Sequence, residues 1–77
     1  MNVEITAPDL GTSRAKFSLW YLREGDRVCE GERVAEVSIP GAIIDIQSPT
    51  SGRLVEKHIY PNALITPGQV LGLIEEE

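Results

Sequence analysis

Cysteine and long apolar runs are almost absent from this chain of 77 residues. The single cysteine, Cys29, excludes an internal disulfide and a zinc site built from several cysteines, and it suits a reducing compartment. No segment approaches the roughly 20 apolar residues of a membrane-spanning helix. Met1 to Leu10 also lacks the charged and apolar regions of a secretory signal. We therefore expect a cytoplasmic protein that does not enter a membrane.

Positive charge is also in short supply. Seven lysines and arginines stand against twelve aspartates and glutamates, which leaves a net charge of -5. This balance opposes binding to nucleic acid or to anionic lipid, because both carry negative charge themselves. The composition favours a protein partner with a basic surface.

The residue combinations of common catalytic sites are missing. His58 is the only histidine, and its neighbours Lys57 and Ile59 favour a place on the surface of a strand over a role as base or metal ligand. Cys29, in an expected turn before Gly31, has no histidine arranged to activate it. The sequence also has no paired acid and base and no phosphate-binding loop. We predict that the chain is not an enzyme and has no catalytic residue and no metal site.

Glycine and proline recur along the whole chain and leave no window for an ordinary helix. The segments between them are short and rich in valine, isoleucine and leucine. Two of these segments alternate with period two, one through Val3, Ile5 and Ala7 and the other through Ile44, Ile46 and Ser48. The pattern predicts many short strands in a sandwich or barrel.

The chain also repeats itself. Glu4 to Gly11 matches Asp45 to Gly52 position by position, and a second set of matches has one constant interval: Leu22 with Ile59, Val28 with Ile65, Gly31 with Gly68, Val34 with Leu71, and Val37 with Ile74. We expect one domain, residues 1–77, whose halves pack about a pseudo-two-fold axis. Gly25 and Asn62 occupy equivalent turns and should both have positive φ. Gly25 and Gly68 are expected to tolerate bulky residues least.

Four segments are similar to a known family. They are Ile5 to Gly11 (ITAPDLG), Leu22 to Gly31 (LREGDRVCEG), Val34 to Val37 (VAEV) and Asp45 to Gly52 (DIQSPTSG). Over nearly the whole chain they resemble the lipoyl domain of 2-oxo-acid dehydrogenase acyltransferases and its biotin carrier relative. The resemblance implies an all-β flattened barrel (barrel-sandwich hybrid) of two four-stranded antiparallel sheets. It also implies that the termini lie close together in one sheet and that the modified lysine lies at a hairpin tip in the other.

The lysine of that tip has no counterpart here. Lipoyl domains have roughly E-T-D-K-A at the tip, and the matching residues are Ser38, Ile39, Pro40, Gly41 and Ala42. Gly41 then occupies the attachment position and offers no amine to acylate, so no cofactor is expected there. Proline followed by glycine suits the two central positions of a type II turn, and we predict that the hairpin itself is kept.

The two lysines of the chain lie elsewhere. Lys57 matches Trp20 in the repeat and is expected within a strand. Lys16 falls in the connection from Thr12 to Phe17, which the resemblance places in a solvated loop near the hairpin. In the strand that contains Phe17, simple alternation places two sets of side chains on opposite faces: Phe17, Leu19 and Tyr21 on one, and Ser18, Trp20 and Leu22 on the other. Glu75 to Glu77 could be a docking feature or a solubilising end, and we expect the second.

Two functions follow from these features. The first is a non-catalytic recognition or accessory module of an acyl-transfer or carboxylase system, whose partner is a component of a dehydrogenase complex or a carboxylase. The alternative is a swinging-arm carrier with lipoate or biotin attached to Lys16 or Lys57. The sequence leaves open the lipoyl or biotinyl lineage, the partner, and whether the chain is a whole protein or a segment of a longer acyltransferase.

Overall fold

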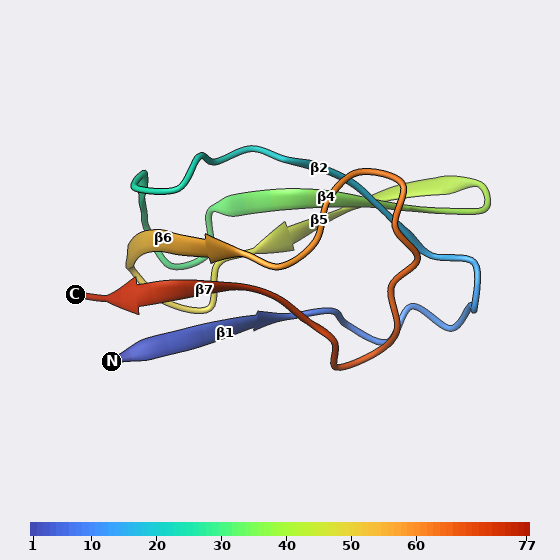
Figure 1. Ribbon diagram of the computed structural model, residues 1–77. Coiled ribbons are helices and arrows are strands. Elements are labelled where there is room, and N and C mark those ends of the chain that lie inside the picture. Colours follow the sequence, from blue (N-terminus) through green and yellow to red (C-terminus); the bar gives the residue numbers. More distant parts are fainter.

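The computed structural model describes residues 1–77 and consists of strands and turns (Figure 1). The strands are β1 (Asn2–Thr6), β2 (Lys16–Trp20), β3 (Arg27–Val28), β4 (Arg33–Ile39), β5 (Ala42–Gln47), β6 (Gly52–Lys57) and β7 (Val70–Glu76). There is no helix long and apolar enough to span a membrane. The all-β fold predicted from the spacing of glycine and proline is confirmed.

Two antiparallel sheets form the layers of the molecule. One has the strand order β1-β7-β6-β3 and the other β2-β4-β5. The molecule measures 35 × 19 × 19 Å. Both termini lie at one end, since β1 and β7 are neighbours, and the hairpin that joins β4 to β5 reaches the opposite end (Figure 1). The expected closeness of the termini within one sheet is confirmed.

The second sheet has three strands, where four were expected. The place of the fourth is taken by a single antiparallel bridge between Leu64 and Lys16, supported by the amide of Ile65, which donates to the carbonyl of Ala15 at 3.0 Å. Turns on both sides, at Pro61 and after Ile65, leave the segment too short to continue the ladder. The bridge still occupies the position equivalent to β3, so the flattened arrangement is preserved.

The internal repeat is confirmed by matching hydrogen bonds. The Gly25 amide donates to the carbonyl of Leu54 at 2.7 Å, and its equivalent, Asn62, donates to Phe17 at 2.8 Å. Three further pairs follow the same correspondence: Gly31 to Ser48 and Gly68 to Ala7; Tyr21 to Val34 and His58 to Leu71; and Cys29 to the Glu32 side chain and Thr66 to the Gln69 side chain. Gly25 has φ 97° and Asn62 φ 76°, as expected for residues that share a turn.

The repeat is broken at one connection. The loop from β1 to β2, residues 7–15, is longer than the equivalent loop from β5 to β6, residues 48–51. Its backbone is organised by side chains, because Asp9 accepts from the amide of Gly11 at 2.9 Å and Thr12 accepts from the amide of Arg14 at 3.1 Å. The extra length lies at the end of the molecule where the β4–β5 hairpin ends.

The core lies between the two sheets. The largest fully buried side chains come from both halves: Phe17, Ile5, Leu54, Leu71, Ile74, Val34 and Val37. Most of them belong to the repeat pairs, which explains why the pattern is duplicated: each half supplies one apolar face and neither can bury it alone. No buried side-chain nitrogen or oxygen lacks a hydrogen-bond partner.

A β-bulge changes the faces of β2. Phe17 pairs with Val37 and Leu19 pairs with Glu36, so the register shifts between Phe17 and Leu19. Simple alternation placed Phe17 and Tyr21 on one face, and this prediction is wrong beyond the bulge. An extra residue reverses the phase of the strand. Phe17 and Trp20 therefore both pack on the core, with ring centroids 5.1 Å apart, while Tyr21 is exposed.

Candidate functional site

The β4–β5 hairpin ends in a two-residue turn at Pro40 and Gly41. Ile39 pairs with Ala42 across its base, so the ladder continues to the last possible pair. Gly41 has φ 83°, the value that the second central position of a type II turn requires. Pro40, Gly41 and Ala42 are exposed, whereas Ile39 is half-buried against the core. The tip is therefore a formed turn whose exposed residues carry no ionisable or nucleophilic side chain.

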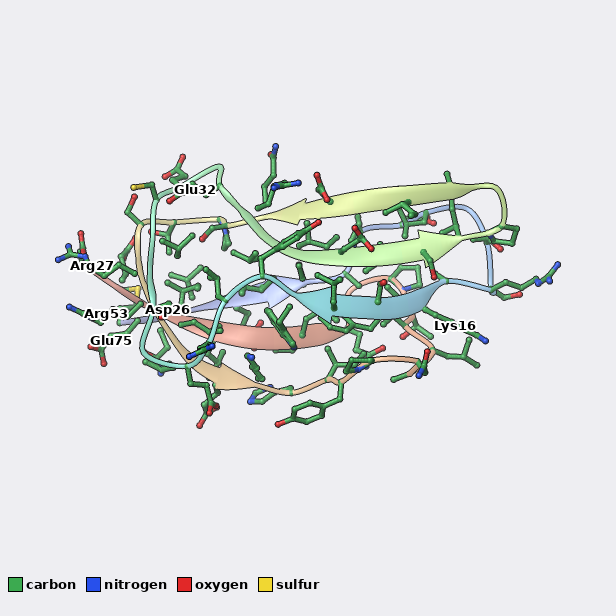
Figure 2. All side chains as sticks on the ribbon, turned by 90° about the horizontal axis from the view of Figure 1, so that it is seen from above. Lys16, Asp26, Arg27, Glu32, Arg53 and Glu75 are labelled. Carbon is green, nitrogen blue, oxygen red and sulfur yellow. The ribbon has the colours of Figure 1, made fainter.

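Lys16 lies beside the hairpin but not in a loop. It is the first residue of β2, pairs with Ser38 of β4 and forms the bridge to Leu64. The expectation of a loop lysine is wrong, because Ala15 and Phe17 hydrogen-bond to the segment around Leu64 and draw the chain into the sheet. The expected proximity to the hairpin is confirmed. Figure 2 shows Lys16 at the end of the molecule opposite to Asp26, Arg27, Arg53 and Glu75.

An open hollow of about 470 Å³ lies next to the tip. Its polar lining is Ser13, Arg14, Lys16 and Ser38, and its apolar lining is Ile39, Pro40 and Leu64. These residues come from the β1–β2 loop, from the start of β2, from the hairpin and from the bridge segment. The sequence analysis placed the connection from Thr12 to Phe17, and with it Ser13, Arg14 and Lys16, near the hairpin. Leu64 was missed because its place depends on the bridge, and no local pattern indicates it.

Lys57 occupies the last position of β6, as expected for a strand residue. Its Nζ lies 5.7 Å from the centre of the Trp20 ring, at cation-π distance. Trp20 is held in turn, because its Nε1 donates to the carbonyl of Ile59 at 2.9 Å. Trp20 therefore serves packing, and Lys57 covers one of its faces.

A polar network that the sequence did not indicate covers the outer face of the three-stranded sheet. The Tyr21 hydroxyl donates to Glu36 at 3.1 Å, and Ser18 donates to the same carboxylate at 3.0 Å. Arg33 lies over the Tyr21 ring at 4.6 Å and pairs with Asp45 at 3.7 Å. Loss of hydration at the phenol, together with the Glu36 carboxylate, raises the pKa of Tyr21 above its ordinary value.

The other residues considered for chemistry stay apart from the tip. Cys29 is exposed in the turn that ends at Glu32, and His58 pairs with Glu56 at 2.8 Å. Glu75 and Glu76 belong to β7, and Glu77 pairs with Arg27, so this segment is not a free tail. All three glutamates are exposed, so the expectation of a solubilising end stays a prediction. The structure contains no group of three or more residues able to hold a metal ion.

Comparisons with known proteins agree with this fold. The family model described as "Biotin-requiring enzyme", which covers biotin and lipoyl domains, matches residues 3–74. The chain is 33% identical over 75 residues to the lipoamide acyltransferase component of the branched-chain alpha-keto acid dehydrogenase complex of Pseudomonas putida, covering 95% of this chain and 18% of that protein. The succinyltransferase component of the 2-oxoglutarate dehydrogenase complex of Rickettsia bellii is 31% identical over 78 residues, with 99% and 20% covered.

A solved structure shares the arrangement of strands. The lipoyl domain of the 2-oxoglutarate dehydrogenase complex from Azotobacter vinelandii superposes with a TM-score of 0.71 at 14% identity, covering 100% of this chain and 99% of that one. The chain spans about a fifth of the length of the two acyltransferases. The family match over most of the chain, the relatives above 30% identity and the common fold lead to one conclusion: this chain belongs to the biotin and lipoyl domain family.

Proposed function

We propose that this domain acts by protein recognition and does not carry a cofactor at its hairpin. The observation that supports the proposal is a complete β4–β5 hairpin whose tip is Pro40 and Gly41. If Gly41 stands where relatives carry the modified lysine, the group has nothing to attach to, since lipoyl and biotinyl transfer acylate a primary amine. The tip thus does not fit the cofactor of the family.

The partner is proposed from the relatives. The proteins named above are components of dehydrogenase complexes, and each contains a segment similar to this chain. A domain with that fold and no attachment amine would occupy the docking place of a carrier on an enzyme of an acyl-transfer or carboxylase system. It would act there as an accessory subunit or domain without taking part in the reaction.

Intact-mass spectrometry tests the absence of modification. The chain is co-expressed with a lipoyl ligase and lipoate, and separately with a biotin ligase and biotin. We expect the unmodified mass in both cultures. An added lipoyl or biotinyl mass would refute the proposal, and a Lys16→Arg or Lys57→Arg variant that loses the added mass would then establish the alternative swinging-arm function.

A gain-of-function variant tests whether the scaffold still presents a carrier turn. Gly41→Lys alone would force a side chain onto φ 83°, although its Cβ would meet no atom within 4 Å. The double variant Pro40→Asp/Gly41→Lys removes the proline that fixes the turn type and should acquire the lipoyl or biotinyl mass. Gly25→Lys is the matched control, because it also has positive φ and open space in another turn. Equal modification of both variants would show that the hairpin is not the recognised element.

A further inference from the structure

The surface around the hairpin tip differs in charge from the rest of the molecule. The three ion pairs of the structure involve Arg27, Arg33 and His58. Arg14 and Lys16 form none, both are exposed, and both line the hollow beside the tip. No acidic residue lines it, in a chain whose net charge is -5. The hollow is therefore a local basic site on an acidic protein.

Apolar side chains lie in the same row as Lys16. Leu64 pairs with Lys16, Lys16 pairs with Ser38, and Ser38 pairs with Ile43, so the four residues cross the sheet on one face. The neighbouring row, which contains Phe17, faces the core. Leu64 is 61% exposed and Ile43 67% exposed, so both offer apolar surface beside Lys16 that a partner could cover.

We propose that this hollow binds an acidic segment of a partner protein. Carboxylates of the segment would pair with Arg14 and Lys16, and an aliphatic side chain beside them would cover Leu64 and Pro40. Charge complementarity favours this occupant, because Arg14 and Lys16 line the hollow together and no acidic residue lines it. The inference rests on the proposed function. The net charge of -5 favours a partner with a basic surface, whereas this hollow is proposed to bind an acidic one.

The apolar contact and the charges have separate tasks in this site. Exposed ion pairs contribute little individually and are screened by salt. Removal of Leu64 from water therefore has to supply much of the affinity, while Arg14 and Lys16 select the acidic sequence and accelerate encounter. Binding should consequently weaken with salt and should also weaken when Leu64 is made polar at constant charge.

Nuclear magnetic resonance tests the proposal on the chain as it exists. The probe is a short peptide of alternating glutamate and leucine, titrated into the isotopically labelled protein, with a lysine and leucine peptide of equal length as control. We expect the amides of residues 13–16, 38–39 and 64 to shift with the acidic peptide only. Absence of shifts at these amides would overturn the proposal. So would a single-stranded oligonucleotide that shifts them at lower concentration.

Matched charge reversals sharpen the test. Lys16→Glu should weaken peptide binding by at least about tenfold, because like charges then face each other in the site. Arg23→Glu changes the net charge equally at an exposed position outside the hollow and should leave binding nearly unchanged. Arg14→Glu, in the loop, repeats the test without altering a strand. Equal weakening by Arg23→Glu would attribute binding to net charge and refute the site.

Failure of this inference is distinguishable from failure of the proposed function. Modification by a ligase is measured by mass and concerns the hairpin or a lysine amine. Peptide binding is measured by amide shifts and concerns Arg14, Lys16 and Leu64. If the protein stays unmodified and its amide signals do not shift with the acidic peptide, the proposed function is kept and the proposal of an acidic partner is refuted.

Discussion

Gly52 is the position at which one added methyl group should do the greatest damage. It lies in β6 between Val28 of β3 and Glu76 of β7, and a Cβ built there would meet the carbonyl oxygen of Glu75 at 2.0 Å. Ordinary contact begins at 3.4 Å, so the two strands would have to separate by about 1.4 Å. The Glu75 carbonyl belongs to the backbone of a central strand and cannot rotate away as a side chain would.

The free energy of unfolding should fall accordingly. Overpacking of a core typically costs about 1–3 kcal/mol, and a backbone clash this close puts Gly52→Ala at the upper end, about 3 kcal/mol. A domain of this size has roughly 0.05–0.15 kcal/mol of stability per residue, or about 4–12 kcal/mol in all. The melting temperature should therefore fall by about 12–24 °C, at roughly 4–8 °C per kcal/mol.

Gly68→Ala supplies the control. Gly68 has φ 80° and open space around an added Cβ, so only the left-handed backbone penalty of roughly 1–2 kcal/mol applies. Urea unfolding is followed by the fluorescence of Trp20, the only tryptophan, which packs on the core. Equal destabilisation by Gly52→Ala and Gly68→Ala would show that close approach of β6 and β7 is not the limiting factor.

Three other changes have defined outcomes. Leu71 is fully buried, and Leu71→Ala should cost about 2–5 kcal/mol in urea unfolding; a smaller loss would mean that the core collapses around the gap. Thr50 is buried and its hydroxyl donates to Glu76 at 2.8 Å, so Thr50→Val should lower the free energy of unfolding by about 1.5 kcal/mol. An unchanged urea midpoint would show that this hydrogen bond does not stabilise the fold. Because the folded-state pKa of Tyr21 is raised, its stabilising effect is complete below the ordinary value near 10 and is lost as pH rises through the folded-state pKa. Tyr21→Phe should flatten that alkaline decline, and Glu36→Gln should lower the pH at which Tyr21 absorbance changes; an unaltered absorbance midpoint would contradict the assignment to Glu36.

Gly25 and Gly68 were expected to tolerate bulky residues least, but the closest packing against a glycine is found at Gly52 and Gly72. Positive φ at Gly25 and Gly68 could be predicted, since turns and repeat matches are local features of the sequence. Both residues nevertheless have free space, whereas Gly52 and Gly72 have none. At Gly72 an added Cβ would meet the Glu56 carbonyl at 2.6 Å and the Trp20 ring at 3.0 Å. Such contacts join residues far apart in the chain, and composition or spacing does not indicate them.

The sequence by itself determined the all-β class, the duplicated motif, the hairpin around Pro40 and Gly41, and the absence of an amine at that tip. These conclusions follow from turn chemistry and from apolar periodicity, which act over a few neighbouring residues. The tertiary structure decided the bulge in β2, the reduction of the fourth strand to a bridge at Leu64, and the joining of Arg14, Lys16 and Leu64 into one hollow. Those features depend on how distant segments pair, and pairing is set by packing of the whole chain.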